Sequence, residues 1–217
     1  MSNSPMFSHR IHIICSPYKT ASSSVEQALV DIGVAKKPMP YSRAILRDNR
    51  ELLLKWRQTA NAAKTYDNFV SLHSSEVFAE LSAYLKPLRK FDIFADAPFG
   101  HTHTHSFVRK LVAPKAVHIW INRDFDAWVD SVHRWEVSHP EIYAGKLKIW
   151  DTDPDRRLLM LRRLWNTNYR AFAELRGHFP DDCLELQFEE LGDYTSLAAF
   201  YGVQAPAKPF PLRNVNS

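Results

Sequence analysis

Four short runs of β-branched and aromatic residues alternate along the chain with longer segments in which apolar residues recur every three or four positions. The short runs have the length and composition of buried strands. We expect strands at residues 10–15, 91–96, 117–122 and 183–188. Strands that alternate with helices are typical of a parallel sheet with helices on its faces. The pattern therefore predicts an α/β fold with a central, mainly parallel sheet.

Helical periodicity is clearest after the first and third strands. The first helix should run from about Ser22 to Ile32, with Gly33 as the residue that ends it. A second helix follows the third strand and carries one apolar stripe of Trp128, Val132 and Trp135. Two more helices are expected, over about 155–176 and 191–201, and a proline-rich tail follows the second of these.

Residues 34–90 lie between the first helix and the second strand and are too many for a simple connection. Two helical patterns fill much of this segment, RAILRDNRELLLKW and SSEVFAELSAYL. We therefore expect a helical insertion placed over the sheet. The length of 217 residues is most simply one domain, 1–217, that includes this insertion.

Composition narrows the classes of partner. The chain has 28 basic and 24 acidic residues, a net charge of +4, and the basic residues are scattered. This balance suits an anionic ligand, but the chain lacks the aromatic-interleaved basic stripe of a nucleic-acid binder. It has no apolar run long enough for a secretory leader or a membrane span. Cys15 and Cys183 lie in apolar runs and are expected to be buried free thiols, so we predict a cytoplasmic protein.

The first candidate site is the segment SPYKTASSS, which joins the first strand to the first helix. Free backbone N–H groups and the positive end of the helix dipole favour an anion at such a place, and Lys19 adds a full charge. The segment has no glycine, so it is neither a Walker A loop nor a dinucleotide fingerprint. The alternative is an ordinary helix capped by serine that happens to follow a lysine.

A second candidate follows the third strand. Arg123 stands at the carboxyl end of this strand, and Ser131 lies eight positions later, two turns into the next helix. Ligands collect at the carboxyl ends of parallel strands, and a guanidinium matches phosphate geometry. An arginine and a hydroxyl here could hold a second phosphate. The alternative is that Arg123 pairs with Asp124 or Asp126 and that Ser131 is only a small packed residue.

In combination, these motifs resemble the sulfotransferases that use 3′-phosphoadenosine 5′-phosphosulfate (PAPS). PYKTASSS is similar to the family's loop for the 5′-phosphosulfate, and RDFDAWVDS matches its Arg and Ser pair for the 3′-phosphate. LELQFEELGDYTSLAAFYGV and the tail PFPLRNVNS are also similar to family segments. The resemblance implies the family's nucleotide-kinase-like fold. It also implies that the 5′-phosphosulfate is bound by Lys19, Thr20, Ala21, Ser22, Ser23 and Ser24, and the 3′-phosphate by Arg123 and Ser131.

Two positions of the loop depart from the family pattern. Ala21 stands where the family usually has glycine, and Tyr18 is inserted between Pro17 and Lys19. A phosphate-cradling loop often needs the φ freedom of glycine. The departure at Ala21 keeps open the alternative of a non-catalytic relative that binds a nucleotide or a protein partner. A nucleoside-triphosphate-dependent kinase is the other alternative, although the Walker glycines are missing.

The segment FADAPFGHTHTH carries the candidates for a catalytic base. The resemblance places the base near the end of the second strand, where Asp96 stands, and Lys19 would stabilise charge on the leaving oxygen. His101, His103 and His105 compete with Asp96, since the ordinary pKa of histidine suits a base better. Three alternating histidines also suggest a metal site, but no partner at zinc spacing follows them, so no metal is expected.

The resemblance implies transfer of a sulfuryl group to a hydroxyl or amine on a small molecule or glycan. Residues 34–90 and 136–165 are expected to build the acceptor pocket, with 34–90 as its cover. Six aromatic residues in these segments could line the pocket or belong to the core: Tyr41, Trp56, Tyr66, Phe69, Tyr143 and Trp150.

Overall fold

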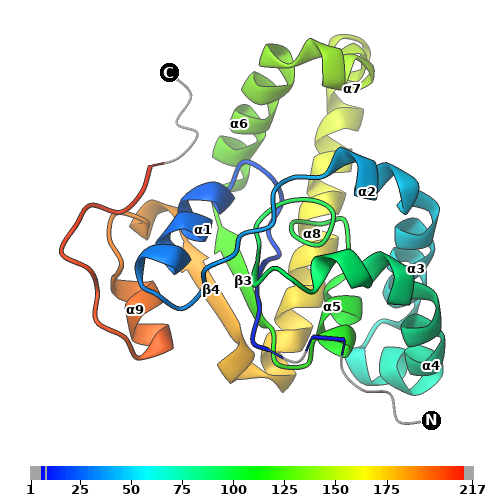
Figure 1. Cartoon of the computed structure of the whole chain (residues 1–217). Coiled ribbons are helices and arrows are strands. Elements are labelled where there is room, and N and C mark those ends of the chain that lie inside the picture. The colour runs from blue at the N-terminus through cyan, green and yellow to red at the C-terminus, as the bar shows by residue number, and fades with distance from the viewer. Residues whose placement is uncertain (1–5, 8, 213–217) are drawn as a thin grey trace.

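Figure 1 shows a computed structural model of the chain, which describes residues 6, 7 and 9–212. Within these residues four parallel strands form one sheet in the order β2-β1-β3-β4. The strands are β1 (His12–Ile14), β2 (Ile93–Phe94), β3 (Val117–Asn122) and β4 (Cys183–Gln187). The predicted α/β fold with a parallel sheet is confirmed, although β1 and β2 are shorter than their apolar runs.

The central strand β3 explains why the strands are apolar on both faces. It pairs with β1 on one side, where Ile13 faces His118, and with β4 on the other, where Ile119 faces Leu184. Ile119 packs into the cluster on one face of the sheet, and Trp120 packs into the cluster on the other face. A strand covered on both faces has no solvent side, so its sequence reads as a continuous apolar run.

Helices cover both faces of this sheet. They are α1 (Ser22–Asp31), α2 (Arg43–Asp48), α3 (Arg50–Ala63), α4 (Tyr66–Leu85), α5 (Ser106–Val112), α6 (Phe125–Ser138), α7 (Pro140–Thr152), α8 (Pro154–His178) and α9 (Thr195–Tyr201). Three short 3-10 turns complete the order: η1 (Lys86–Leu88), η2 (Pro180–Asp182) and η3 (Phe188–Glu190).

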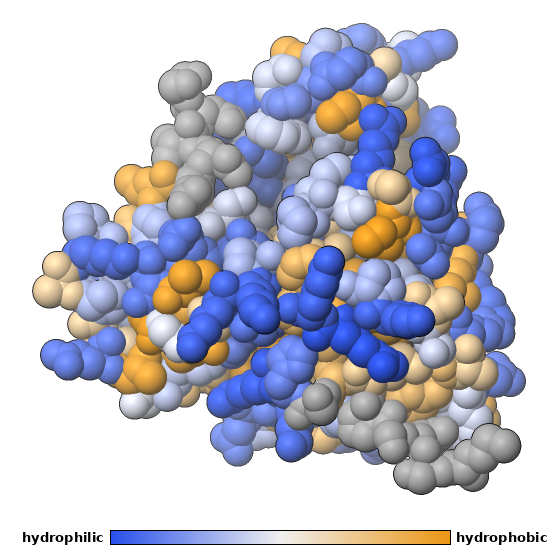
Figure 2. Space-filling view, in the orientation of Figure 1, coloured by the Kyte–Doolittle hydropathy of each residue, from blue (hydrophilic) through white to orange (hydrophobic). Residues whose placement is uncertain are grey.

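Two apolar clusters define the layers. Side chains of α1 and α9 pack on one face of the sheet, and side chains of α3, α4, α5, α6 and α8 pack on the other. The long helix α8 runs beside the sheet, and its first turns project beyond it together with α6 and α7 (Figure 1). Figure 2 shows small apolar patches among hydrophilic residues on this side of the molecule.

Residues 34–90 form helices α2, α3 and α4, as their patterns predict. The start of this segment is instead extended along β2, because Pro38 bridges Ile93 and the Met39 N–H donates to the Ile93 carbonyl oxygen at 2.8 Å. Helices α5 and α7 were not expected. Helix α7 buries none of its residues, so its sequence carries only a weak amphipathic signal.

Local backbone conformation sets the end of α1 and the start of α9. Gly33 ends α1 with a φ of 78°, and its N–H and that of Val34 bond to carbonyl oxygens of the last turn. The last helix begins at Thr195 rather than near residue 191, because residues 188–190 form η3. Cys15 and Cys183 are both buried free thiols, as expected.

The tail PFPLRNVNS is described only in part. Phe210 is buried against Tyr194 at a ring distance of 5.2 Å, whereas residues 213–217 lie outside the described part of the chain. Across residues 6, 7 and 9–212, no helix has both the length and the apolar character that a membrane crossing requires.

Candidate active site

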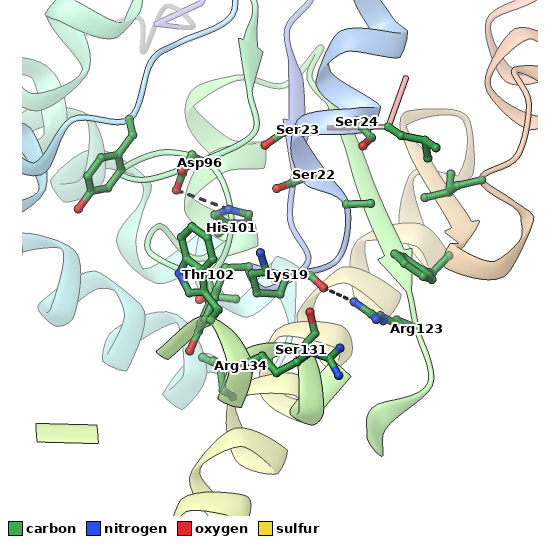
Figure 3. A pocket seen from close by; sticks show the side chains of 18 of the residues that line it. Lys19, Ser22, Ser23, Ser24, Asp96, His101, Thr102, Arg123, Ser131 and Arg134 are labelled. Carbon is green, nitrogen blue, oxygen red and sulfur yellow. Dashed lines mark hydrogen bonds and ion pairs between the residues drawn. The ribbon is translucent and has the colours of Figure 1, made fainter. Parts of the chain in front are cut away.

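A cavity of about 1260 Å³ opens where the carboxyl ends of all four strands meet (Figure 3). Each strand is followed by residues that line it, namely Lys19 after β1, Asp96 after β2, Arg123 after β3 and Glu189 after β4. Parallel α/β sheets bind their ligands at this edge. Pockets for a single small molecule usually measure about 300–1000 Å³, so the space is sufficient for two ligands side by side.

The loop between β1 and α1 is held by hydrogen bonds to its backbone. The Trp128 indole N–H donates to the Tyr18 carbonyl oxygen at 2.8 Å, and Arg123 Nη1 donates to the Lys19 carbonyl oxygen at 2.7 Å. Lys19 and Ala21 both have a φ of 67°, a conformation that costs a residue with a Cβ free energy. These bonds stabilise a loop whose backbone would otherwise relax.

Ala21 occupies the N-cap of α1 in the left-handed conformation and offers no side-chain cap. The alternative of an ordinary serine-capped helix is therefore wrong. Ser22, Ser23 and Ser24 form the first turn of α1 and line the cavity, so the positive end of this helix faces it. The cavity wall thus has the geometry of an anion-binding loop, although it contains no glycine.

Three cationic side chains converge opposite this helix end: Lys19, Arg123 and Arg134. Burial lowers the pKa of Lys19, and the charges of Arg123 and Arg134 lower it further. Its ammonium lies 4.0 Å from the centre of the Trp135 ring. Like charges gathered in one cavity repel one another, so a bound anion would be favoured there.

Arg123 does not pair with Asp124 or Asp126 in the part of the chain that the structure describes, so that alternative is wrong. Its guanidinium binds the Lys19 carbonyl oxygen, and it lies 4.1 Å from the centre of the Phe188 ring. The Asp124 carboxylate caps α6 instead, by accepting from the Ala127 N–H at 2.9 Å. Arg123 thus lines the cavity without an acidic partner among the described residues, and its Nε is buried without a hydrogen bond there.

Helix α6 brings Ser131 and Arg134 to the same wall of the cavity. Ser131 has 6% of its surface exposed and lies two helical turns after Arg123, as its spacing predicts. Arg134 was missed, although it lies three positions after Ser131 and so shares its helix face. Trp135 also differs from the prediction, since it lines the cavity and covers Lys19 instead of packing with Trp128 in the core.

Thr20 lies apart from the other loop residues. Its side chain is fully buried, its hydroxyl donates to the Pro17 carbonyl oxygen at 2.8 Å, and the same hydroxyl lies 3.0 Å from Ser16 Oγ. It is not part of the cavity wall. The hydroxyl that we expected to bind a phosphosulfate instead stabilises the loop from inside.

Asp96 and His101 lie together at the end of β2. His101 Nε2 is 3.5 Å from Asp96 Oδ1, and His101 Nδ1 is 3.0 Å from the Ser16 carbonyl oxygen (Figure 3). A carbonyl oxygen only accepts, so Nδ1 carries the proton and the Nε2 lone pair of the neutral ring faces the carboxylate. Burial lowers the pKa of His101 and outweighs the opposing effect of Asp96, so the ring is neutral at neutral pH. The pair can accept one proton.

The turn that carries this pair is fixed by close packing. A Cβ on Gly100 would lie 2.6 Å from the Asp96 nitrogen, so only glycine fits there. Arg109, with 1% of its surface exposed, donates from Nη2 to the carbonyl oxygens of Gly100 and His101. The His101 N–H donates to the Ile14 carbonyl oxygen at 2.7 Å, which ties the turn to β1.

The three alternating histidines take different places. His101 and His103 line the cavity, whereas the His105 ring caps α5 by accepting from the Phe107 N–H at 3.1 Å. No three histidine, cysteine or acidic side chains come together as a metal site anywhere in residues 6, 7 and 9–212.

Of the six aromatic residues expected in the acceptor pocket, some line the cavity and others lie outside its lining. Tyr41 and Tyr143 line the cavity. Trp56 and Phe69 are buried in the core, and Tyr66 packs against it. The Trp150 indole donates to Glu136 at 3.0 Å, outside the cavity lining.

Glu136 is the centre of a buried cluster behind the loop. Its carboxylate receives a hydrogen bond of 2.5 Å from Arg157 and lies 3.5 Å from the Lys146 ammonium. Tyr18 and Trp150 donate to the same carboxylate. One acidic group thus joins α6, α7 and α8 to the loop after β1.

A family model described as a sulfotransferase domain matches residues 12–217 of the chain. None of the curated proteins matches it.

Proposed function

Since the chain belongs to the sulfotransferase family, we propose that it transfers a sulfuryl group from PAPS to a hydroxyl or amine of a second substrate. One observation carries this proposal most strongly. Arg123, which follows β3, is hydrogen-bonded to the backbone of Lys19, which follows β1, and both line one cavity with the start of α1. This arrangement offers two anion subsites in a space large enough for a donor and an acceptor.

The residues present fit such a donor. Lys19, the first turn of α1 (Ser22, Ser23 and Ser24) and the backbone of Thr20 and Ala21 would hold the 5′-phosphosulfate. Arg123 and Ser131 would hold the 3′-phosphate, and we add Arg134 as a further cation beside both. A guanidinium suits a phosphate because its planar donors match two oxygens at once.

When bound, PAPS supplies the sulfuryl group, and its S–O bond to phosphate breaks as the acceptor's bond to sulfur forms. Lys19 would neutralise the charge that develops on the leaving oxygen. Asp96, half exposed at the cavity wall, would take the proton of the acceptor. His101 stands behind Asp96 with its Nε2 lone pair directed at the carboxylate, so it would stabilise or receive that proton.

The conformation of Ala21 bears on the alternative of a non-catalytic relative. Ala21 already adopts the left-handed φ of 67° that a glycine would take there, so its Cβ does not prevent the loop from forming. No feature of the cavity favours binding without turnover. A kinase reaction has no support either, because the loop contains no glycine to approach a triphosphate closely.

Calorimetry with 3′-phosphoadenosine 5′-phosphate (PAP) tests the donor site without an acceptor. We expect the wild type to bind PAP and Arg123→Ala to weaken binding by about ten- to a hundredfold, since an arginine-phosphate pair is charge-assisted. Arg170→Ala is the matched control, because Arg170 is exposed on α8 away from the cavity. No heat with PAP, or equal affinity in Arg123→Ala, would overturn the proposal.

A further inference from the structure

A second, smaller cavity of about 420 Å³ adjoins the main one, and Tyr41 and His103 belong to the lining of both. Helices α2 and α3 provide the rest of its walls. Four arginines and three leucines line it: Arg43, Arg47, Arg50, Arg57, Leu46, Leu53 and Leu54. We call this cavity the arginine groove.

Helix spacing places the arginines of each helix on one face. Arg43 and Arg47 are four residues apart on α2, and Arg50 and Arg57 are seven apart on α3, so each pair lies along one side of its helix. Leu53 is buried beneath them. The groove therefore has an apolar floor and a cationic rim.

The rim carries charge without matching acids. No aspartate or glutamate is among its lining residues. Arg47 pairs with the adjacent Asp48 at 2.9 Å, and both are well exposed. Arg43, Arg50 and Arg57 form no ion pair within the described ranges 6, 7 and 9–212. Like charges gathered on a concave surface repel one another unless a bound anion compensates them.

His103 marks the junction with the main cavity. The residue is mostly buried, and its Nδ1 has no hydrogen-bond partner among the described residues. Burial lowers its pKa to about 3, and Arg57 is among the charges that lower it further. The main cavity, which Asp96 and His101 line, thus meets the arginine groove at His103.

We propose that the arginine groove binds an anionic group of the acceptor. This inference rests on the proposed function and specifies the acceptor class. The acceptor carries its reactive hydroxyl or amine at one end and a carboxylate, sulfate or phosphate at the other. The leucine floor contacts the body of the acceptor that joins the two ends, and His103 offers a hydrogen bond on the way. A neutral acceptor would leave the arginines without a counter-charge.

Matched acceptors that differ mainly in charge test this inference. The first pair is 3-(4-hydroxyphenyl)propionate and its primary amide, and the second is 4-nitrophenyl β-glucuronide and 4-nitrophenyl β-glucoside. Their affinities are measured by calorimetry on the full chain, with and without PAP. We expect the anionic member of at least one pair to bind about tenfold or more tightly than its neutral partner.

Variants then assign that preference to the groove. Arg50→Gln with Arg57→Gln should remove the preference for the anionic member, while the affinity for PAP stays at the wild-type value. Arg170→Gln, on exposed α8, should keep both. Circular dichroism and urea unfolding verify that the double variant folds.

Several results would overturn the inference. They are equal binding within both pairs, no binding of either anionic probe at millimolar concentration, or an unchanged preference in the double variant. These results are distinct from failure of the proposed function. If the wild type does not bind PAP but prefers the anionic probe through Arg50 and Arg57, the donor assignment would be overturned. The arginine groove would then remain an anion site.

Discussion

The hydroxyl of Tyr18 donates a hydrogen bond of 2.9 Å to Oε1 of Glu136, a carboxylate that has no exposed surface. Burial raises the pKa of Tyr18, and the charge of Glu136 raises it further, so the hydroxyl keeps its proton and remains a donor. Tyr18 is one of the two residues by which the loop departs from the family pattern, and Ala21 is the other. The departure at Tyr18 therefore joins the anion loop to the helices that project beyond the sheet.

Tyr18→Phe removes this hydrogen bond and little else. We expect the free energy of unfolding to fall by about 2 kcal/mol, because hydrogen bonds to charged groups contribute about 1.5–3 kcal/mol. We also expect PAP to bind several-fold more weakly, because Lys19 follows Tyr18 directly. Urea unfolding and calorimetry measure the two effects. Tyr66→Phe, remote from the cavity, is the control, and an unchanged PAP affinity in Tyr18→Phe would show that the bond does not position the loop.

Ala21→Gly should stabilise the protein. The left-handed φ of 67° costs alanine about 1–2 kcal/mol, which glycine would not lose. The greater conformational freedom of glycine in the unfolded chain offsets about 0.4–1 kcal/mol of this stabilisation. The net expectation is an increase of up to about 1.6 kcal/mol in the free energy of unfolding, with PAP binding retained. Thermal or urea unfolding provides the measurement.

Lys64→Gly is the matched control for this substitution. Lys64 is exposed, has a φ of 66° and lies after α3, away from the donor subsites. Lys64→Gly should also stabilise the protein and leave PAP binding unchanged. If Ala21→Gly destabilised the chain while Lys64→Gly stabilised it, the Ala21 methyl would be making a favourable contact that outweighs its backbone strain.

Asp96→Asn should reduce sulfuryl transfer by about 10²–10⁴-fold without weakening PAP binding, since it removes the proposed base and leaves the donor subsites intact. Asp130→Asn serves as the control, because Asp130 is exposed on α6. The initial rate with PAPS and an accepted substrate is the measurement. A rate within a few-fold of wild type would remove Asp96 from the mechanism.

The rate of the wild type should depend on pH through His101. Its pKa lies below the ordinary value of about 6.5 because burial disfavours the charged ring. We therefore expect a rate that is constant from about pH 8 to 6.5 and that falls on further acidification, as Nε2 takes up a proton and pairs with Asp96. A rate that already falls between pH 8 and 7 would contradict this assignment.

Stability should also fall in acid. Burial lowers the pKa of His118 to about 3 and that of His12 to about 4, whereas both would titrate near 6.5 in the unfolded chain. Between these values the unfolded chain binds more protons than the folded one, so the free energy of unfolding decreases as the pH falls. Each histidine contributes a slope of about 1.4 kcal/mol per pH unit in this range.

His118→Leu isolates one of these contributions. The His118 ring is fully buried on β3, and neither ring nitrogen has a partner in the described part of the chain. The variant should lose stability less steeply between pH 6 and 4.5, by about 1.4 kcal/mol per pH unit. Urea unfolding at a series of pH values measures the slope. A curve for His118→Leu that runs parallel to wild type would contradict the prediction.

The sheet and the main helices could be predicted because their signals are local. Residues 117–122 carry four apolar residues of high strand propensity among six positions, and β3 has those bounds in the structure. Arg123 and Ser131 could also be placed, since a strand end and a helical spacing suffice to bring them to one edge. Helix α7 gave no comparable signal because it buries none of its residues.

The remaining features depend on contacts between distant segments. Tyr18 and Glu136 are 118 positions apart, and nothing near either residue indicates that they meet. Trp135 continues an apolar stripe, yet it covers Lys19 because α6 crosses the loop at that turn. Thr20 resembles a phosphate ligand by type, but its hydroxyl is satisfied by Pro17 within the loop. Residue type alone does not distinguish these outcomes.

The hydrogen bond from Arg123 to the Lys19 carbonyl oxygen makes the two proposed anion subsites mechanically dependent on each other. A phosphate that orders the Arg123 side chain would also order the loop backbone and so strengthen binding of a second anion by the loop. By linkage, the anion bound by the loop would strengthen binding of the phosphate by Arg123 to the same degree. A ligand with both phosphates would then bind more tightly than the sum of the binding free energies of two independent subsites predicts. The proposed donor site would then discriminate against adenylates that lack the 3′-phosphate through the shape of the loop as well as through the missing charge.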